Sequence, residues 1–209
     1  MCWSVGAPFR PLYIALMPSR LHRCDEAGHS HFWTISCYRR LQFFHDDGMK
    51  RVTVTALWRL RQRFGICLQA YVIMPEHLHV LLYPHRRGDD RPVPISKLLQ
   101  SFKQHIGLFG KQRLRDVWRK QGQLWSPPLN RWAKGEFGKQ EIMNTRGYDR
   151  NIFSEHELRE KVDYIHKNPL IRGLVPRPDE WRWSSYRFYA LGDRSILPMD
   201  WDGAWPVIW

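Results

Sequence analysis

The sequence of 209 residues predicts an α+β protein, in which helices pack on an antiparallel sheet of ferredoxin-like order. Segments rich in β-branched and aromatic residues alternate with segments of helical apolar spacing, in the order strand, helix, strand, strand, helix, strand. Apolar residues make up 43% of the chain, enough for a sizeable buried core. We find no apolar run long enough to span a membrane, so we expect no membrane segment.

The first strand and the first helix are predicted by composition and by capping residues. Residues 31–38 (HFWTISCY) are aromatic and β-branched, as is typical of a strand. Asp46 or Asp47 can cap a helix over residues 49–64, because a carboxylate accepts from the free N–H groups of a first turn. Gly65 can end this helix in a left-handed conformation.

Two strands and a second helix follow. Residues 66–74 and 77–83 predict strands joined by a tight turn at Pro75-Glu76. Ser96 is the expected N-cap of the second helix. The apolar side of this helix consists of Leu98, Leu99, Phe102, Ile106 and Phe109.

The remainder of the fold contains a segment without clear periodicity. Residues 118–147 contain several Gly, Pro and basic residues and predict a long loop or insertion. A short strand is expected over 148–153. Ser154 and Glu157 then form the pattern of a capping box, and Pro169 predicts that the following helix ends at or just before the preceding residue.

We expect three parts in the chain: an N-terminal arm (1–28), a single domain (29–190) and a tryptophan-rich tail (191–209). The chain has 11 tryptophans, and two interpretations of those near the C-terminus stay open. They stack on unpaired nucleotide bases, or they fasten the tail to the core. These residues are Trp181, Trp183, Trp201, Trp205 and Trp209.

The charge balance indicates a polyanionic partner. The formal net charge is +13, from 33 Lys and Arg against 20 Asp and Glu. Nucleic acid is the expected partner, and the alternative is a basic but merely solvated surface. The four cysteines lack the spacing of a zinc ribbon or a disulfide framework, and no signal-peptide pattern begins the chain, so we expect a cytoplasmic protein. The cysteines are Cys2, Cys24, Cys37 and Cys67.

The most informative feature is a pair of histidines at the start of a predicted strand. Alternate residues of a strand share a face, so His77 and His79 point the same way, about 7 Å apart along the strand. Two imidazoles so placed can bind one divalent cation. The alternative is a pair of structural histidines. Glu76 beside them is either a ligand, a base that orients them, or a solvated carboxylate.

A second group lies on the capped helix. Tyr164 and Asn168 are four residues apart and project from one face, with Lys161 and Lys167 beside it. A phenol flanked by cations suits nucleophilic attack on a phosphodiester. An Asn oxygen suits Mg²⁺ or Mn²⁺ and complements two imidazoles. His166 points away, so we interpret it as structural or as a DNA contact.

Three runs of sequence carry a resemblance to a known family: MPEHLH at 74–79, YIHKNPLIRGLV at 164–175 and WSSY at 183–186. Together, in this order, they resemble the single-tyrosine HUH transposases, and most closely the REP-associated tyrosine transposases of bacteria. One region departs from the family pattern: residues 126–145 resemble an insertion between the two ends of a run that is usually continuous.

The resemblance implies a ferredoxin-like HUH endonuclease/transposase domain that cleaves and rejoins single-stranded DNA. It implies that His77, His79 and Asn168 bind the metal, Mg or Mn. It also implies that Tyr164 forms a 5′-phosphotyrosine link and leaves a free 3′-hydroxyl. The implied substrates are palindromic DNA hairpins, and the implied location is the bacterial cytoplasm, near the nucleoid. The protein would be a monomer or a homodimer.

Two other functions stay open. One is a hairpin-binding protein that does not turn over; the other is a metal-dependent phosphodiesterase that uses water. A further expectation concerns the basic residues on or just after the second helix, which we predict to contact DNA phosphates together with the lysines beside the tyrosine. The predicted DNA contacts are Lys97, Lys103, Lys111, Arg113, Arg115, Lys161 and Lys167.

Overall fold

A four-stranded antiparallel sheet organises the computed structural model, which describes residues 29–84, 92–122, 126–138, 140–144 and 147–201. The strands are β1 (Ser30–Ser36), β2 (Cys67–Ile73), β3 (His77–Tyr83) and β4 (Tyr148–Ile152). Their order across the sheet is β2-β3-β1-β4, and each neighbouring pair is antiparallel. This order and connectivity confirm the predicted ferredoxin-like fold.

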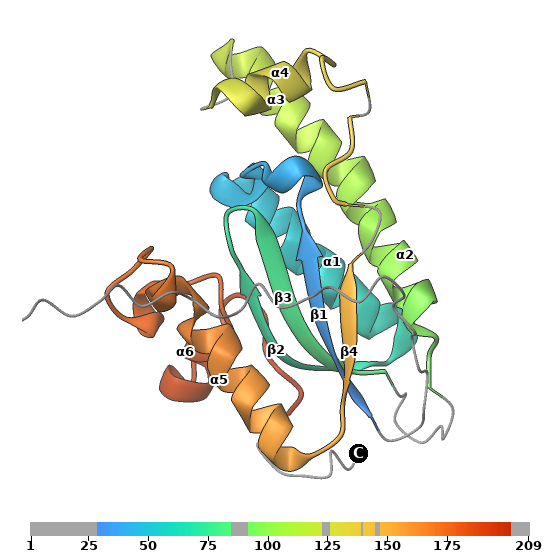
Figure 1. Ribbon diagram of the computed structural model, residues 1–209, viewed down its shortest axis with the longest axis vertical. Helices are drawn as coiled ribbons and strands as arrows, with labels where there is room; N and C mark the ends of the chain where they lie inside the picture. The colour runs from blue at the N-terminus through green and yellow to red at the C-terminus, as the bar shows by residue number, and fades with distance from the viewer. Residues whose placement is uncertain (1–28, 85–91, 123–125, 139, 145–146, 202–209) are drawn as a thin grey trace, which may run out of the picture.

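The helices cover both faces of this sheet. The helices α1 and α2 lie behind it and α5 lies in front, as Figure 1 shows. None of the described helices is long and apolar enough to cross a membrane. The α-helices are α1 (Asp47–Phe64), α2 (Ile95–His105), α3 (Lys111–Gln121), α4 (Pro127–Ala133), α5 (Glu155–Ile171) and α6 (Tyr186–Leu191). Short 3₁₀ turns cover Tyr38–Arg40, Phe43–His45 and Pro178–Glu180, and one π-helical turn covers Ile106–Gly110.

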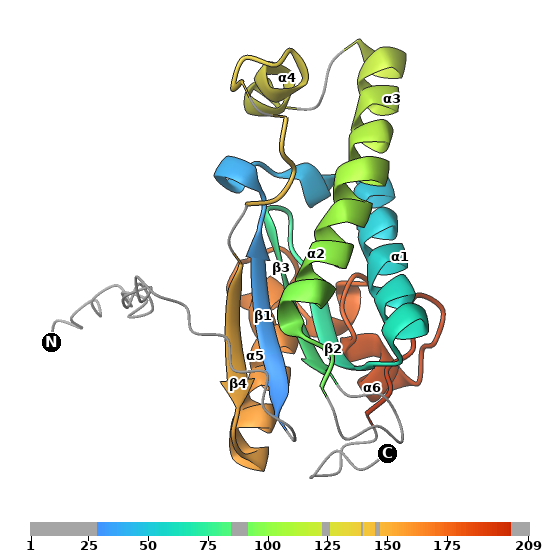
Figure 2. The same cartoon turned by 90° about the vertical axis from the view of Figure 1, so that its right-hand side faces the viewer.

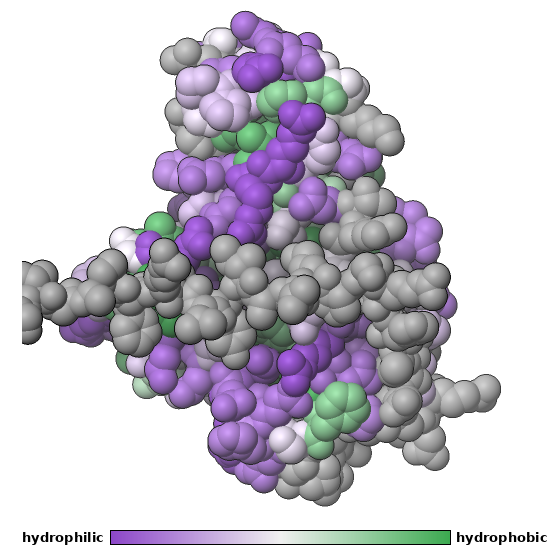
Figure 3. All heavy atoms as spheres, viewed as in Figure 1, coloured by the Kyte–Doolittle hydropathy of each residue, from purple (hydrophilic) through white to green (hydrophobic). Residues whose placement is uncertain are grey.

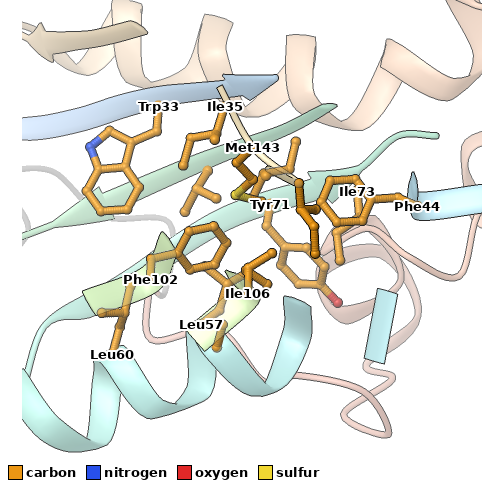
Figure 4. Packing of buried hydrophobic residues seen from close by; sticks show 14 of the residues in the cluster. Trp33, Ile35, Phe44, Leu57, Leu60, Tyr71, Ile73, Phe102, Ile106 and Met143 are labelled. Carbon is orange, nitrogen blue, oxygen red and sulfur yellow. The ribbon is translucent and has the colours of Figure 1, made fainter. Parts of the chain in front are cut away.

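Strand alternation divides the core into two layers. Trp33 and Ile35 of β1 face α1 and α2, where Leu57 and Phe102 pack against them (Figure 4). Phe32 of the same strand faces the other way and joins a smaller cluster beneath α5. Because successive side chains of a strand point to opposite faces, one sheet supports both layers. The second layer is where the polar face of β3 meets α5.

Capping residues set the start of the two long helices. The Asp46 carboxylate accepts from the Gly48 N–H at 3.1 Å, so Asp46, and not Asp47, caps α1. Gly65 ends α1 at a φ of 65°, as predicted. In α5, the Ser154 hydroxyl accepts from the Glu157 N–H at 3.2 Å. The Glu157 carboxylate accepts from the N–H of Phe153, so only half of the expected capping box forms.

The structure corrects three predictions about helices. Residues 118–147 are not a long loop, because α3 extends to Gln121 and α4 follows. Ser96 does not cap α2, because Pro94 occupies the N-cap position. The helix α5 does not end at Asn168 and runs through Pro169 to Ile171.

The corrections to α3 and α5 have physical reasons. Only two residues of α3 are buried, so its sequence lacks a strong apolar stripe. The helix continues the direction of α2 past the end of the sheet, with α4 beside it (Figure 2). At Pro169 one backbone hydrogen bond is lost, but Arg172 and Leu174 still donate to the carbonyls of Asn168 and Pro169 at 3.0 and 2.9 Å.

The segment after α5 covers the edge of β2. Ile73 donates to the Trp183 carbonyl at 2.9 Å and Asp200 donates to the Leu68 carbonyl at 2.8 Å, so the strand's outer backbone groups are paired. Trp183 and Trp201 are buried in this contact. For these two residues the structure favours packing over base stacking. The other two tail tryptophans, at 205 and 209, lie outside the described residues, as does the arm 1–28.

Candidate active site

The two histidines of β3 point to the same face, as their spacing predicts. Both are buried, and their Nε2 atoms lie 3.2 Å apart. The antiparallel pairing of β1 with β3 sets Ser36 opposite His77 and Thr34 opposite His79. The face therefore carries four polar side chains on two neighbouring strands, close to the end of the sheet where β2 turns into β3.

Hydrogen bonds at the other ring nitrogens orient both imidazoles. His77 Nδ1 lies 3.1 Å from the Glu76 carboxylate, and His79 Nδ1 lies 2.9 Å from the Thr34 hydroxyl. The hydrogen bond from His77 and, more weakly, the charge of Arg172 lower the pKa of Glu76, so it is an ionised acceptor at neutral pH. His77 therefore donates to Glu76 from Nδ1, and its Nε2 faces the Nε2 of His79.

The site has the donor chemistry of a cation site. Two nitrogen ligands with metal bonds of about 2.1 Å lie about 3.0–3.4 Å apart at octahedral to tetrahedral angles, which brackets the 3.2 Å between the Nε2 atoms. Burial, followed by the charge of His77, lowers the pKa of His79 well below its usual value. His79 is therefore neutral at pH 7, as a metal ligand must be.

Asn168 is the predicted third ligand, through its side-chain oxygen. The helix α5 packs on β2 and β3 and carries Asn168 into the buried layer, where 6% of its surface is exposed. Within the described residues its Oδ1 atom has no hydrogen-bond partner. A buried carbonyl oxygen without a partner is costly, and a bound cation would satisfy it. Across the described part of the chain, no three His, Cys, Asp or Glu side chains form a metal-binding group, so a metal here would depend on this amide.

Tyr164 lies beside the histidines and remains accessible. Its ring centroid is 5.2 Å from that of His79 and 6.1 Å from that of Phe32, and 43% of its surface is exposed. Lys161 Nζ lies 5.6 Å from the centre of the Phe32 ring, on the same side. Lys167 instead forms an ion pair with Asp163 at 3.0 Å. The structure thus brings Tyr164 and Lys161 to the histidine pair, and it turns Lys167 toward a neighbouring carboxylate.

The other predicted DNA contacts lie away from this centre, on α2 and α3. Lys97 lies 5.7 Å from the centre of the Phe64 ring, and Lys103 donates to the Asn144 carbonyl at 3.0 Å. Arg113 forms a two-point ion pair with Asp46 at 2.7 and 2.9 Å, which fastens α3 to the start of α1. Lys111 and Arg115 lie on the same helix, and Arg115 is exposed.

Two residues that position this site are absent from the sequence predictions. Thr34 orients His79, but only the pairing of β1 with β3 reveals this. Arg172 donates to the Glu76 carboxylate at 2.8 Å from the end of α5. The available signal in the sequence was its position directly after the NPLI run, four residues after Asn168. Residues four apart lie on the same side of a helix, so Arg172 is expected near the layer that contains Asn168.

This chain is similar to known proteins in sequence and in fold. No protein-family model matches the chain. It is 26% identical over 136 residues to the REP-associated tyrosine transposase of Escherichia coli strain K12, covering 65% of this chain and 62% of that protein. It is 25% identical over 187 residues to a Haemophilus influenzae protein named "Putative REP-associated tyrosine transposase", covering 88% of this chain and 94% of the relative.

A solved structure shows the same fold. It is a REP-associated tyrosine transposase bound to a REP hairpin, with a TM-score of 0.59 and 22% sequence identity, covering 90% of this chain and 93% of that chain. The match to the Escherichia coli relative spans less than two thirds of that protein's length. The resemblance predicted from the three sequence runs is confirmed: this chain is similar in sequence to REP-associated tyrosine transposases, and it has the fold of one of them.

Proposed function

We propose that this protein cleaves and rejoins single-stranded DNA at hairpins through a 5′-phosphotyrosine intermediate on Tyr164. One observation carries the proposal: an accessible phenol stands beside two buried imidazoles whose Nε2 atoms converge at 3.2 Å. A nucleophile next to a cation site is the arrangement that transfer of a phosphodiester requires.

The side chains of the site have separate tasks in this reaction. The Tyr164 oxygen attacks a backbone phosphorus; a bond from that oxygen to phosphorus forms, and the bond from phosphorus to the 3′-oxygen breaks. The phenol loses its proton and the departing 3′-oxygen gains one. Attack by a 3′-hydroxyl on the phosphotyrosine reverses these steps and rejoins the strand.

The residues present fit a divalent metal, Mg or Mn. His77, His79 and Asn168 would hold it, and when bound it supplies Lewis-acid polarisation of a phosphate oxygen. Glu76 and Thr34 keep the two imidazoles in the orientation that presents Nε2. Arg172 holds Glu76 in turn, so a chain of two contacts, from Arg172 to Glu76 and from Glu76 to His77, fixes the position of His77.

The surface and the relatives support DNA as the substrate. The net charge is +13, and hydrophilic side chains occupy much of the described surface on the α5 side (Figure 3). The solved neighbour is bound to a REP hairpin. By analogy we propose a palindromic hairpin with a single-stranded flank as the substrate of this protein.

A covalent-adduct assay tests the proposal and separates its rivals. Labelled hairpin DNA from palindromic repeats beside the gene is incubated with the protein and Mn²⁺, then resolved on a denaturing gel. We expect a protein–DNA adduct, and peptide mass spectrometry should place the nucleotide on Tyr164. Hairpin binding without an adduct would indicate a binding protein. Cleavage without an adduct would indicate a phosphodiesterase that uses water.

A further inference from the structure

The turn after β1 has an unusual backbone. Arg39 and Arg40 have φ angles of 50° and 57°, and they are the only described residues other than glycine with positive φ. A Cβ atom makes this region unfavourable, because it approaches the following carbonyl oxygen, and two such residues in succession are rare. Strain of this kind persists where the surrounding structure enforces it, and it is frequent next to active sites.

The strained turn is attached to the loop that carries the histidine motif. The Cys37 N–H donates to the Glu76 carbonyl at 2.9 Å, and the Phe44 N–H donates to the Pro75 carbonyl at 3.0 Å. The Phe43 and Phe44 side chains are fully buried, so the chain cannot relax outward. The turn and the loop before His77 therefore form one rigid unit.

This unit directs Arg40 toward the candidate active site. Arg40 Nη1 donates to the Ser36 hydroxyl at 3.3 Å. Ser36 lies directly opposite His77 in the β1–β3 ladder and shares its face, as Thr34 shares that of His79.

Among the described residues, Arg40 differs from Arg172, the other arginine near the motif, in having no anionic partner. No ion pair of Arg40 with a carboxylate occurs among the described residues, and its side chain is exposed. Arg39, by contrast, points to the aromatic ring of Phe137, 4.6 Å from the ring centre. The other arginine near the motif, Arg172, is bound to Glu76. A guanidinium has five N–H donors, and among the described residues the single bond to Ser36 leaves most of those of Arg40 unused.

We propose that Arg40 binds the phosphate that Tyr164 attacks. A planar guanidinium with donors to spare matches two phosphate oxygens at once, and Arg40 is held next to Ser36, on the face of the sheet that carries His77. The charge that develops on the phosphate oxygens during transfer is then stabilised from the side of β1. This inference rests on the proposed function and adds a residue that the sequence motifs do not contain.

The first test measures the rate of adduct formation at saturating hairpin DNA. Arg40→Gly removes the guanidinium and suits a positive φ, so the turn stays intact. We expect a rate about 100-fold lower, as for the loss of one charge-stabilising donor, and partial recovery in Arg40→Lys. The matched control is Arg39→Gly, in the same strained turn, with a rate within about threefold of wild type. An unchanged rate in Arg40→Gly would overturn the proposal.

The second test needs no turnover. In a Tyr164→Phe background, hairpin oligonucleotides that carry a neutral methylphosphonate at one linkage at a time are titrated by fluorescence anisotropy. At the linkage that the wild type cleaves, the neutral group should weaken binding about tenfold when Arg40 is present, and not when it is Gly. The proposal is overturned if the loss of affinity depends on Arg40 at none of the linkages. It is also overturned if this dependence occurs at a linkage other than the cleaved one. If the wild type does not cleave hairpin DNA, the proposed function is refuted, and so is the premise that Tyr164 attacks a phosphate.

Discussion

Two histidine–carboxylate pairs are buried in this sheet, on opposite faces. His31 Nδ1 lies 3.0 Å from Asp149 on the α1–α2 face, and His77 Nδ1 lies 3.1 Å from Glu76 on the α5 face. Only His77 has a second imidazole within 3.2 Å, that of His79, and the His79 ring contacts Tyr164. A histidine oriented by a carboxylate therefore occurs both in the structural core and in the candidate active site. The candidate active site is distinguished by the further side chains that meet at the second ring nitrogen of its histidine.

The two pairs also differ in access. His31 is fully buried among core side chains, and within the described residues its Nε2 atom has no hydrogen-bond partner. A side chain buried at that position cannot contact DNA. At His77, the half-exposed Tyr164 opens the layer to solvent. We therefore expect substitutions at the His77 pair to reduce activity and substitutions at the His31 pair to reduce stability.

The largest effect is expected for Tyr164→Phe. Removing the phenol oxygen removes the nucleophile, so the covalent adduct should fall below detection on a denaturing gel. Hairpin affinity should stay within about twofold, because the aromatic ring that contacts His79 is kept. The matched control is Tyr186→Phe, outside the site. Full adduct yield from Tyr164→Phe would remove the main distinction between the two histidine pairs.

The next effect concerns the histidines of the candidate cation site. His77→Ala and His79→Ala should each reduce cleavage by about 100- to 1,000-fold, and a chelator should have the same effect on the wild type. Calorimetric titration with Mn²⁺ should show binding to the wild type and none to the double variant. Equal binding by both proteins would make this pair structural, like His31.

The matching change at the other pair should affect folding instead. His31→Ala leaves Asp149 buried without its partner, at a cost of about 3–5 kcal/mol in the free energy of unfolding. Urea denaturation measures this loss. The folded variant should form adducts at a rate within about threefold of wild type, because His31 faces away from Tyr164. A stable protein with no cleavage would mean that the two faces of the sheet are coupled.

A smaller effect is expected for Asn168→Ala. Water can replace a neutral oxygen ligand, so cleavage should fall by about tenfold and Mn²⁺ should bind more weakly. Asn168→Asp keeps an oxygen at this position and should retain metal binding. If Asn168→Ala increased stability and left Mn²⁺ affinity unchanged, the Asn168 oxygen would have no part in binding a metal.

The smallest effect is expected from the basic residues of α3. The sequence pattern predicts that neutralising Lys111, Arg113 and Arg115 flattens the dependence of log affinity on log salt by about two to three units. Because Arg113 is already paired with Asp46, we expect about two units, from Lys111→Gln with Arg115→Gln. Fluorescence anisotropy on a labelled hairpin at several salt concentrations measures the slope. An unchanged slope would move the DNA to another surface, such as that of Arg131 and Lys134.

The sequence alone was enough to predict features that depend on local periodicity and capping. Alternation along β3 placed His77 and His79 on one face, and helical spacing placed Tyr164 and Asn168 on one side of α5. The limits of α1 followed from a carboxylate before the helix and a glycine after it. Such features involve residues within a few positions of one another, so the chain's own geometry decides them.

Tertiary structure decided everything that depends on a partner distant in sequence. The register between β1 and β3 gave His79 its contact with Thr34 and aimed Arg40 at the face of His77. Packing of α3 against α1 engaged Arg113 with Asp46, and contacts around α5 let the helix continue through Pro169. Local sequence does not show which side chains become neighbours in the folded chain. These contacts form between segments far apart in the sequence, and only the packing of the sheet and its helices places them side by side.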